Sequence, residues 1–140
     1  MTALTESDDA LKDILTRCRR FAVIIASANP ARPSYEVMRY LIDHGYEVFP
    51  VNPGWAGREI LGRPVVASLR DLPCSVDVVD VFRHPDGVPE IARDAIAIGA
   101  KVLWMQIGAS NDEAAKLAQA AGLQVVAERC PKIEHARLIG

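Results

Sequence analysis

The stretch with the clearest capacity for chemistry is Ser-Ala-Asn-Pro-Ala-Arg-Pro-Ser, residues 27–34. It combines hydroxyl side chains with Arg32, whose guanidinium can pair with a phosphate through two parallel hydrogen bonds. A helical pattern starts at Pro33, and a helix N-terminus offers unpaired backbone N–H groups to an anion. The stretch therefore predicts an anion site made by Ser27, Arg32, Ser34 and backbone amides. The alternative is that Arg32 is solvated at a helix start, where a cation is mildly unfavourable.

Other reactive side chains lack the spacing that catalysis or metal binding needs. Cys130 and His135 stand five residues apart around a proline, which does not fix a nucleophile beside a base, so we predict a buried structural thiol. His44 and His84 have no Cys, His or carboxylate partner at metal-ligand spacing, so we expect no metal site.

The acidic residues of the segment 76–82 do not form a catalytic pair either. Asp77 and Asp80 lie three apart in a predicted strand and point to opposite faces. We expect Asp80 to accept backbone hydrogen bonds near the end of the sheet. In the segment that follows, Trp104 and Met105 are predicted core residues, and Gln106 is the candidate for facing a ligand.

The elements that must position these residues alternate between strand and helix. Apolar runs without alternation predict parallel strands covered on both faces, at residues 21–26, 46–51, 76–82, 101–105 and 123–127. Helical patterns begin near Ser7, at Pro33, near Val88 and at a capping box that starts at Ser110. Residues 55–66 are irregular, with at most a small strand at 64–66. These patterns predict an α/β, Rossmann-like, doubly wound sheet of five parallel strands in three α/β/α layers, with the order 3-2-1-4-5. Ligands bind such sheets at the carboxyl ends of the strands, so the important loops are 27–34, 52–54, 82–85 and 106–110.

Composition restricts the possible partners. The 140 residues suit a single domain, 1–140, whose first 18 residues supply a helix packed on the sheet. Half of the residues are apolar (50%), 24% are charged and the net charge is −2, a pattern that does not favour nucleic acid. No stretch resembles a signal peptide or a membrane-spanning helix, and the 3 cysteines form no Cys-x-x-Cys pair. We therefore expect a reduced, cytoplasmic protein without membrane contact.

A dinucleotide site is disfavoured by what the loops lack. The first loop has no glycine where a Gly-x-Gly-x-x-Gly motif would stand, and the second strand ends in Val51-Asn52-Pro53 without a carboxylate for a ribose. An NAD(P)-dependent enzyme is accordingly the least favoured function.

Several motifs in the same order resemble the small stand-alone CoA-binding proteins of bacteria. The motifs are Pro-Ala-Arg-Pro-Ser-Tyr at 30–35, Val-Asn-Pro at 51–53, Val-Asp-Val-Val-Asp-Val-Phe-Arg at 76–83, Trp-Met-Gln-Ile-Gly at 104–108 and Arg-Cys-Pro-Lys-Ile-Glu at 129–134. Those proteins are similar to the CoA-binding domain of the succinyl-CoA synthetase alpha subunit. The resemblance implies CoA or acyl-CoA as the ligand.

The resemblance also assigns positions. It puts the CoA diphosphate on Ser27, Ala28, Asn29, Arg32 and Ser34, the adenosine beside Asn52 and Pro53, and a wall at Phe82, Arg83 and His84. Two departures bear on affinity: Ile25 stands where the family usually has glycine, and Asn-Pro-Gly at 52–54 offers no counterpart to a lysine of the synthetase. We expect CoA binding without catalysis. A regulatory or protein-interaction module that has lost tight ligand binding is the alternative, and a homodimer stays open.

Overall fold

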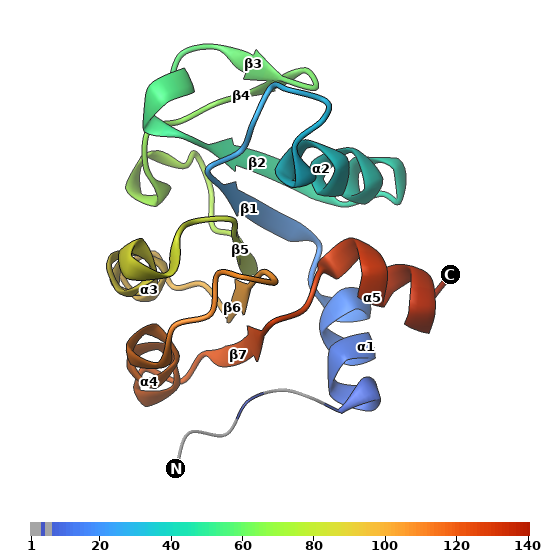
Figure 1. Cartoon of the computed structure of the whole chain (residues 1–140), viewed down its shortest axis with the longest axis vertical. Helices are drawn as coiled ribbons and strands as arrows, with labels where there is room; N and C mark the ends of the chain where they lie inside the picture. Colours follow the sequence, from blue (N-terminus) through green and yellow to red (C-terminus); the bar gives the residue numbers. More distant parts are fainter. Residues whose placement is uncertain (1–3, 5–6) are drawn as a thin grey trace.

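A five-stranded parallel sheet forms the centre of the molecule (Figure 1), seen in a computed structural model that describes Leu4 and residues 7–140. In spatial order its strands are β2 (Glu47–Val51), β1 (Arg20–Ile24), β5 (Val78–Val81), β6 (Val102–Met105) and β7 (Gln124–Ala127). A hairpin of β3 (Glu59–Ile60) and β4 (Arg63–Pro64) lies beyond β2. The start of the predicted N-terminal segment, residues 1–3 and 5–6, lies outside the described residues.

Helices cover both faces of the sheet. One face carries α1 (Asp8–Arg17), α2 (Pro33–Asp43) and α5 (Pro131–Leu138), and the other carries α3 (Val88–Ala97) and α4 (Asp112–Ala120). Successive residues of β1 enter opposite cores: Phe21 and Val23 pack under the first group of helices, and Ala22 and Ile24 under the second. This two-sided burial explains why the strands show no polar alternation. The predicted Rossmann-like fold with three layers is confirmed.

The predicted strand order is wrong in one respect. The third predicted strand, β5, pairs with β1 on the side away from β2, with Phe21 opposite Val78, so the order of the five predicted strands is 2-1-3-4-5. Within the described chain, the β-pairing on the outer side of β2 is a single parallel bridge between Val51 and Val66. On the side of β2 where the predicted order places the strand at 76–82, the segment 55–66 supplies this bridge and the short hairpin of β3 and β4. As a consequence, the order reverses between β1 and β5, and not between the first and the fourth predicted strands.

Side-chain caps and prolines set the starts of the helices. Ser7 accepts a hydrogen bond from the Ala10 N–H at 3.2 Å, and Pro33 occupies the first turn of α2, as predicted. The cap of α4 is Asn111, which accepts the Ala114 N–H at 3.0 Å, so the capping residue is one position later than the predicted Ser110. None of the helices in the described part of the chain is long and apolar enough to span a membrane.

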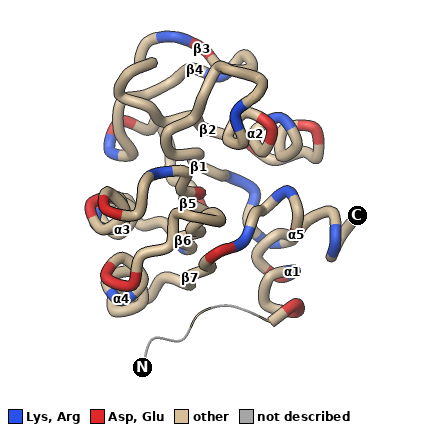
Figure 2. The backbone as a smooth tube through the Cα atoms, in the orientation of Figure 1, with Lys and Arg blue, Asp and Glu red and all other residues tan. Residues whose placement is uncertain are grey.

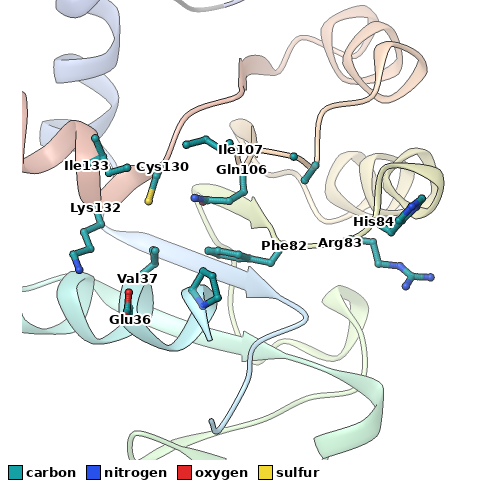
Figure 3. A pocket seen from close by; sticks show the side chains of 13 residues that line it. Glu36, Val37, Phe82, Arg83, His84, Gln106, Ile107, Cys130, Lys132 and Ile133 are labelled. Atoms are coloured by element: carbon teal, nitrogen blue, oxygen red, sulfur yellow. The ribbon is translucent and has the colours of Figure 1, made fainter. Parts of the chain in front are cut away.

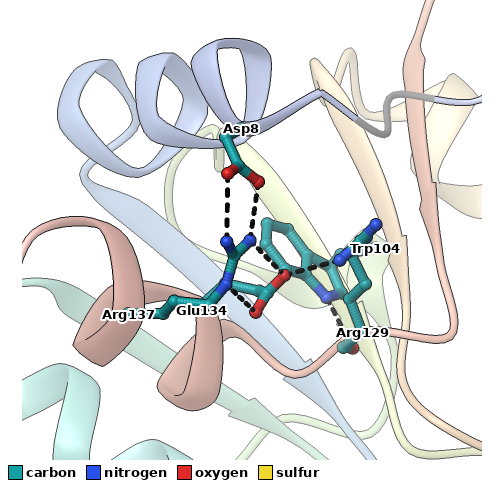
Figure 4. A network of polar contacts seen from close by, with 5 residues as sticks. All are labelled: Asp8, Trp104, Arg129, Glu134 and Arg137. Carbon is teal, nitrogen blue, oxygen red and sulfur yellow. Dashed lines mark hydrogen bonds and ion pairs between the residues drawn. The ribbon is translucent and has the colours of Figure 1, made fainter.

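A polar network fixes α5 against α1 and the sheet (Figure 4). Arg137 donates to both oxygens of Asp8, at 2.8 and 3.1 Å, and also to Glu134 at 3.1 Å. Glu134, which is buried, accepts a further hydrogen bond from Arg129 at 2.7 Å, and the carbonyl of Arg129 accepts the Trp104 indole N–H at 2.8 Å. Burial would raise the pKa of the Glu134 carboxyl, but the hydrogen bonds from Arg137 and Arg129 outweigh it and lower the pKa below its usual value.

A second polar contact joins α5 to α2. The Tyr40 hydroxyl and His135 Nδ1 are 2.8 Å apart, and the His44 ring stacks on Tyr40 with centroids 4.0 Å apart. Burial, followed by the positive charges of His44 and Arg19, lowers the pKa of His135. The position of α5 is thus set from both sides, by α1 and by α2.

Candidate functional site

Three adjoining hollows lie at the carboxyl edge of the sheet. The α2–α5 cavity, of about 520 Å³, opens between α2, the ends of β5 and β6, and α5 (Figure 3); its wall contains Pro33, Glu36, Val37, Phe82, Arg83, His84, Gln106, Ile107, Gly108, Ala109, Cys130, Lys132 and Ile133. The first-loop hollow, of about 450 Å³, is lined by Ile25, Ser27, Arg32, Pro33, Ser34, Asn52 and Phe82. The β2–α3 hollow, of about 370 Å³, is lined by Ile24, Ile25, Val51, Asn52, Pro53, Gly54, Ala67, Ser68, Leu69, Arg83, Glu90, Ile91 and Asp94.

The hollows share wall residues, and we refer to the three together as the groove. Pro33 and Phe82 line both the α2–α5 cavity and the first-loop hollow, whereas Ile25 and Asn52 line both the first-loop hollow and the β2–α3 hollow. The groove crosses the ends of β1 and β5, between which the strand order reverses. This is where doubly wound sheets bind ligands, and the α2–α5 cavity alone is within the roughly 300–1,000 Å³ typical of small-molecule sites.

Most backbone N–H groups of the first loop donate hydrogen bonds to other groups of residues 27–34. The hydroxyl of Ser34, a buried residue of α2, accepts the Ser27 N–H at 3.1 Å, and the Ser27 hydroxyl in turn accepts the Asn29 N–H at 3.1 Å. The Asn29 side chain accepts the Ala31 N–H at 3.0 Å. Within the described residues, the N–H groups of Ala28 and Ser34 are left without a partner. The predicted cluster of free amides is therefore smaller than expected, because serine and asparagine side chains bond to the nearby backbone.

Arg32 is the charged side chain of the first-loop hollow. It is the N-cap residue of α2, its side chain makes no cap hydrogen bond, and it is exposed. In the described part of the chain, no carboxylate pairs with its guanidinium. Lys and Arg positions elsewhere lie on both sides of the sheet and are interspersed with Asp and Glu positions (Figure 2), so local geometry, more than an overall field, determines where an anion would bind.

Ile25 has a strained backbone at the start of the first loop. Its φ is 61°, in the left-handed region that a β-branched residue rarely adopts, and its N–H donates to the Val51 carbonyl at 2.8 Å. The left-handed conformation costs about 1–2 kcal/mol for a residue other than glycine. The glycine implied at this position by the family resemblance is thus explained by the backbone conformation. The Ile25 side chain also occupies the boundary between two hollows.

The remaining predicted site residues differ in where they lie. Asn52 joins the ends of β1 and β2: its amide donates to the Ala26 carbonyl at 2.8 Å and its carbonyl accepts the Gly54 N–H at 2.9 Å. Pro53 follows it in the wall of the β2–α3 hollow. The predicted wall residues are Phe82, Arg83 and His84, and all of them line the α2–α5 cavity. Ala28 and Asn29 are exposed and belong to none of the three walls.

Gln106 faces the α2–α5 cavity. The residue is 8% exposed, and its Oε1 is buried without a hydrogen-bond partner among the described residues. Trp104 and Met105 are core residues, as predicted. Cys130, Lys132 and Ile133, which line the opposite wall, were not among the predicted site residues. The available signal was topological: the turn after the fifth strand must also reach the carboxyl edge, but the predicted loops stopped at the fourth strand.

Asp80 does not accept the backbone hydrogen bonds that the sequence predicted. It is fully buried on β5, opposite Val23 and Trp104, and neither carboxyl oxygen has a partner in the described structure. Burial raises the pKa of Asp80 well above its usual value. Asp77 has the predicted role instead, because its carboxylate accepts the N–H groups of Arg19 and Arg20 at 3.0 and 3.1 Å.

The fold and the groove define a class of protein: a doubly wound α/β domain with adjoining hollows at the switch point of its sheet. The sequence matches the CoA binding domain family over residues 19–136, and the chain belongs to this family. Among the described residues, no cluster of three or more His, Cys, Asp and Glu side chains could hold a metal ion.

Relatives of the chain are found both as small proteins and as parts of larger ones. The uncharacterized protein YneT of Bacillus subtilis is 37% identical over 126 residues, which are 90% of this chain and 92% of that protein. A solved structure of a hypothetical protein from Pyrococcus horikoshii OT3 is 43% identical, with a TM-score of 0.94 over 100% of this chain and 99% of that chain. The acetate–CoA ligase (ADP-forming) I subunit alpha of Pyrococcus furiosus is 36% identical over 86 residues, which are 59% of this chain and 19% of that subunit.

Proposed function

We propose that this protein binds CoA or acyl-CoA along the groove and catalyses no reaction of its own. The observation that carries the proposal is Arg32, an exposed guanidinium without a carboxylate partner in the described chain, which lines the middle one of three connected hollows. The diphosphate binds Arg32 and the unpartnered N–H groups of Ala28 and Ser34. The family and the partial match to a CoA ligase subunit support this class of ligand.

The other two hollows take the two ends of the ligand. The adenosine lies in the β2–α3 hollow beside Asn52 and Pro53, where Glu90 and Asp94 can accept hydrogen bonds from an exocyclic amine. The pantetheine arm passes the wall at Phe82 and enters the α2–α5 cavity. Three adjoining hollows with an arginine in the middle one suit a long ligand with a negatively charged centre.

The absence of catalysis is part of the proposal. The best candidates for a nucleophile and its base are Cys130 and His135, which stand five residues apart. His135 is buried, and its Nδ1 is engaged by the Tyr40 hydroxyl at 2.8 Å. The proposal therefore treats the protein as a CoA carrier or sensor.

A second candidate function is a protein-interaction module of the same fold. It is favoured by the bulk of Ile25 between two hollows, and by the exposed side chains of Ile107 and Ile133, which are 58% and 55% exposed at the rim of the α2–α5 cavity.

Thermal unfolding with increasing CoA tests the first function. A ligand that binds the folded state raises Tm in proportion to the logarithm of its concentration. Arg32→Ala should weaken CoA binding roughly tenfold to hundredfold, because it removes charge-assisted hydrogen bonds worth about 1.5–3 kcal/mol. Arg39→Ala is the matched control, since Arg39 is exposed on the same helix and lines none of the three hollows. An unchanged Tm at millimolar CoA would reject the proposal and favour the interaction module.

A further inference from the structure

Cys130 is a free thiol in the wall of the α2–α5 cavity. It directly precedes α5, it is 6% exposed, and its sulfur points into the cavity (Figure 3). Its side chain does not cap the helix. Because so little of the residue meets bulk solvent, a reagent reaches this sulfur through the cavity. Cys18 and Cys74, the other cysteines, line none of the three hollows.

Gln106 independently indicates that the cavity holds a polar ligand group at this place. The Gln106 side chain extends across the cavity toward the Cys130 sulfur (Figure 3), and its buried Oε1 has no partner in the described structure. The tip of the side chain that faces Cys130 is its amide nitrogen (Figure 3), which also has no hydrogen-bond partner in the described structure, so a ligand with a carbonyl group beside it would be favoured. The arm of CoA carries amide carbonyl groups and ends in a thiol, which fits both Gln106 and Cys130.

The charges around the sulfur also suit a thiol reaction. Cys130 lies at the N-terminus of α5, where the helix dipole favours negative charge, and Lys132 lines the same cavity. Glu36 of α2 lies on the cavity wall as the opposing charge. The thiolate is the reactive form of cysteine in disulfide exchange, and Cys130 is placed where a ligand in the cavity can meet it.

We propose that Cys130 forms a reversible mixed disulfide with the thiol end of the bound ligand, an inference that rests on the proposed function. The co-reactant is the symmetric disulfide of the ligand. The Cys130 thiolate attacks one of its sulfurs, the bond between the two ligand molecules breaks, and a new bond joins Cys130 Sγ to the bound molecule. The second molecule leaves as a thiolate and takes up the proton that Cys130 lost. Cys130 is oxidised and one ligand molecule is reduced, so no further oxidant is needed.

The test incubates the reduced, full-length protein with CoA disulfide or, separately, with glutathione disulfide at the same concentration. Intact mass spectrometry follows adduct formation, and peptide mapping of the wild-type protein locates the adduct. We expect one CoA on Cys130, released by dithiothreitol, in the wild type and in Cys74→Ser but not in Cys130→Ser. CoA disulfide should react about tenfold or more faster than glutathione disulfide, because binding positions its sulfur beside Cys130. Arg32→Ala should remove this advantage and leave the glutathione rate unchanged.

The outcomes separate this inference from the proposed function. If CoA raises Tm but CoA disulfide leaves Cys130 unmodified, the mixed disulfide is refuted and CoA binding stands. The same conclusion follows if the adduct maps to Cys74, or if glutathione disulfide labels Cys130 as fast as CoA disulfide does. If CoA does not raise Tm, the proposed function is refuted and the inference falls with it.

Discussion

Replacing Ile25 by glycine and, separately, by alanine tests whether the first loop is strained. Both variants remove the same half-buried side chain, so their difference reports the backbone at φ 61°. Alanine in the left-handed region pays about 1–2 kcal/mol, a cost that glycine avoids. Against this, the greater entropy of the unfolded chain destabilises the glycine variant by about 0.5–1 kcal/mol relative to the alanine variant. We therefore expect Ile25→Gly to be more stable than Ile25→Ala by about 0.75 kcal/mol, which is roughly 3 °C in Tm for a chain of this size.

Urea unfolding measures this difference, and Lys116 provides a control. Lys116 is exposed in the middle of α4, where right-handed helical backbone makes glycine about 1 kcal/mol worse than alanine. The order of the two substitutions should thus be opposite at the two positions. If Ile25→Ala is as stable as Ile25→Gly, or more stable, the claim of strain is refuted.

The same pair of variants separates two effects of Ile25 on the ligand. The side chain lines two hollows, so if its bulk limits CoA binding, both variants bind CoA more tightly than the wild type. If the closeness of the backbone to the diphosphate is limiting, Ile25→Gly alone improves binding, because only glycine relaxes there without cost. Isothermal titration with CoA distinguishes the two results.

Two further predictions concern buried carboxyl groups. Glu134→Gln should destabilise the protein by about 2 kcal/mol at neutral pH, because Arg129 and Arg137 lose a charged acceptor. The pKa of Glu134 is lowered in the folded state, so its contribution to the free energy of unfolding is present above the unfolded-state pKa near 4.5 and is lost as the pH falls. The urea midpoints of variant and wild type should therefore converge in acid. Asp80→Asn should instead stabilise the protein at neutral pH. Burial raises the pKa of Asp80 in the folded state, so the wild type loses stability as the pH rises through this folded-state pKa. Urea unfolding at increasing pH should show the variant gaining stability relative to the wild type, and a constant difference would contradict this.

Local sequence signals predicted the elements, and long-range packing decided what they missed. Pro33 and Ser7 mark helix starts through contacts within one turn, so the sequence alone was sufficient. The strand order was not local: it depended on whether the strand predicted at residues 76–82 pairs with β2 or with β1, and it pairs with β1. Likewise, Asp77 and Asp80 were both expected in one strand, but Asp77 precedes β5, where it meets the N–H groups of Arg19 and Arg20, while Asp80 is buried within the strand.

The candidate site was predictable where topology alone decides it. Arg32 and Phe82 follow strands and therefore reach the carboxyl edge in any sheet of this class. Cys130 was interpreted as a core thiol, and it is buried. It also lines a cavity whose other walls come from α2 and from the ends of β5 and β6, and no spacing within the motif encodes this arrangement. The φ of Ile25 is hidden for a similar reason, since isoleucine itself gives no sign of left-handed backbone.

The helix α5, which Cys130 precedes and which carries Lys132, is also the one that Arg137 joins to Asp8, near the opposite end of the chain. A molecule held in the cavity therefore makes α5 harder to detach, and through it α1, although α1 supplies no residue to the cavity wall. Amide protons of α1 should accordingly exchange more slowly with deuterated solvent when CoA is bound. Conversely, acid that protonates Asp8 and Glu134 should speed the dissociation of the ligand before the sheet unfolds.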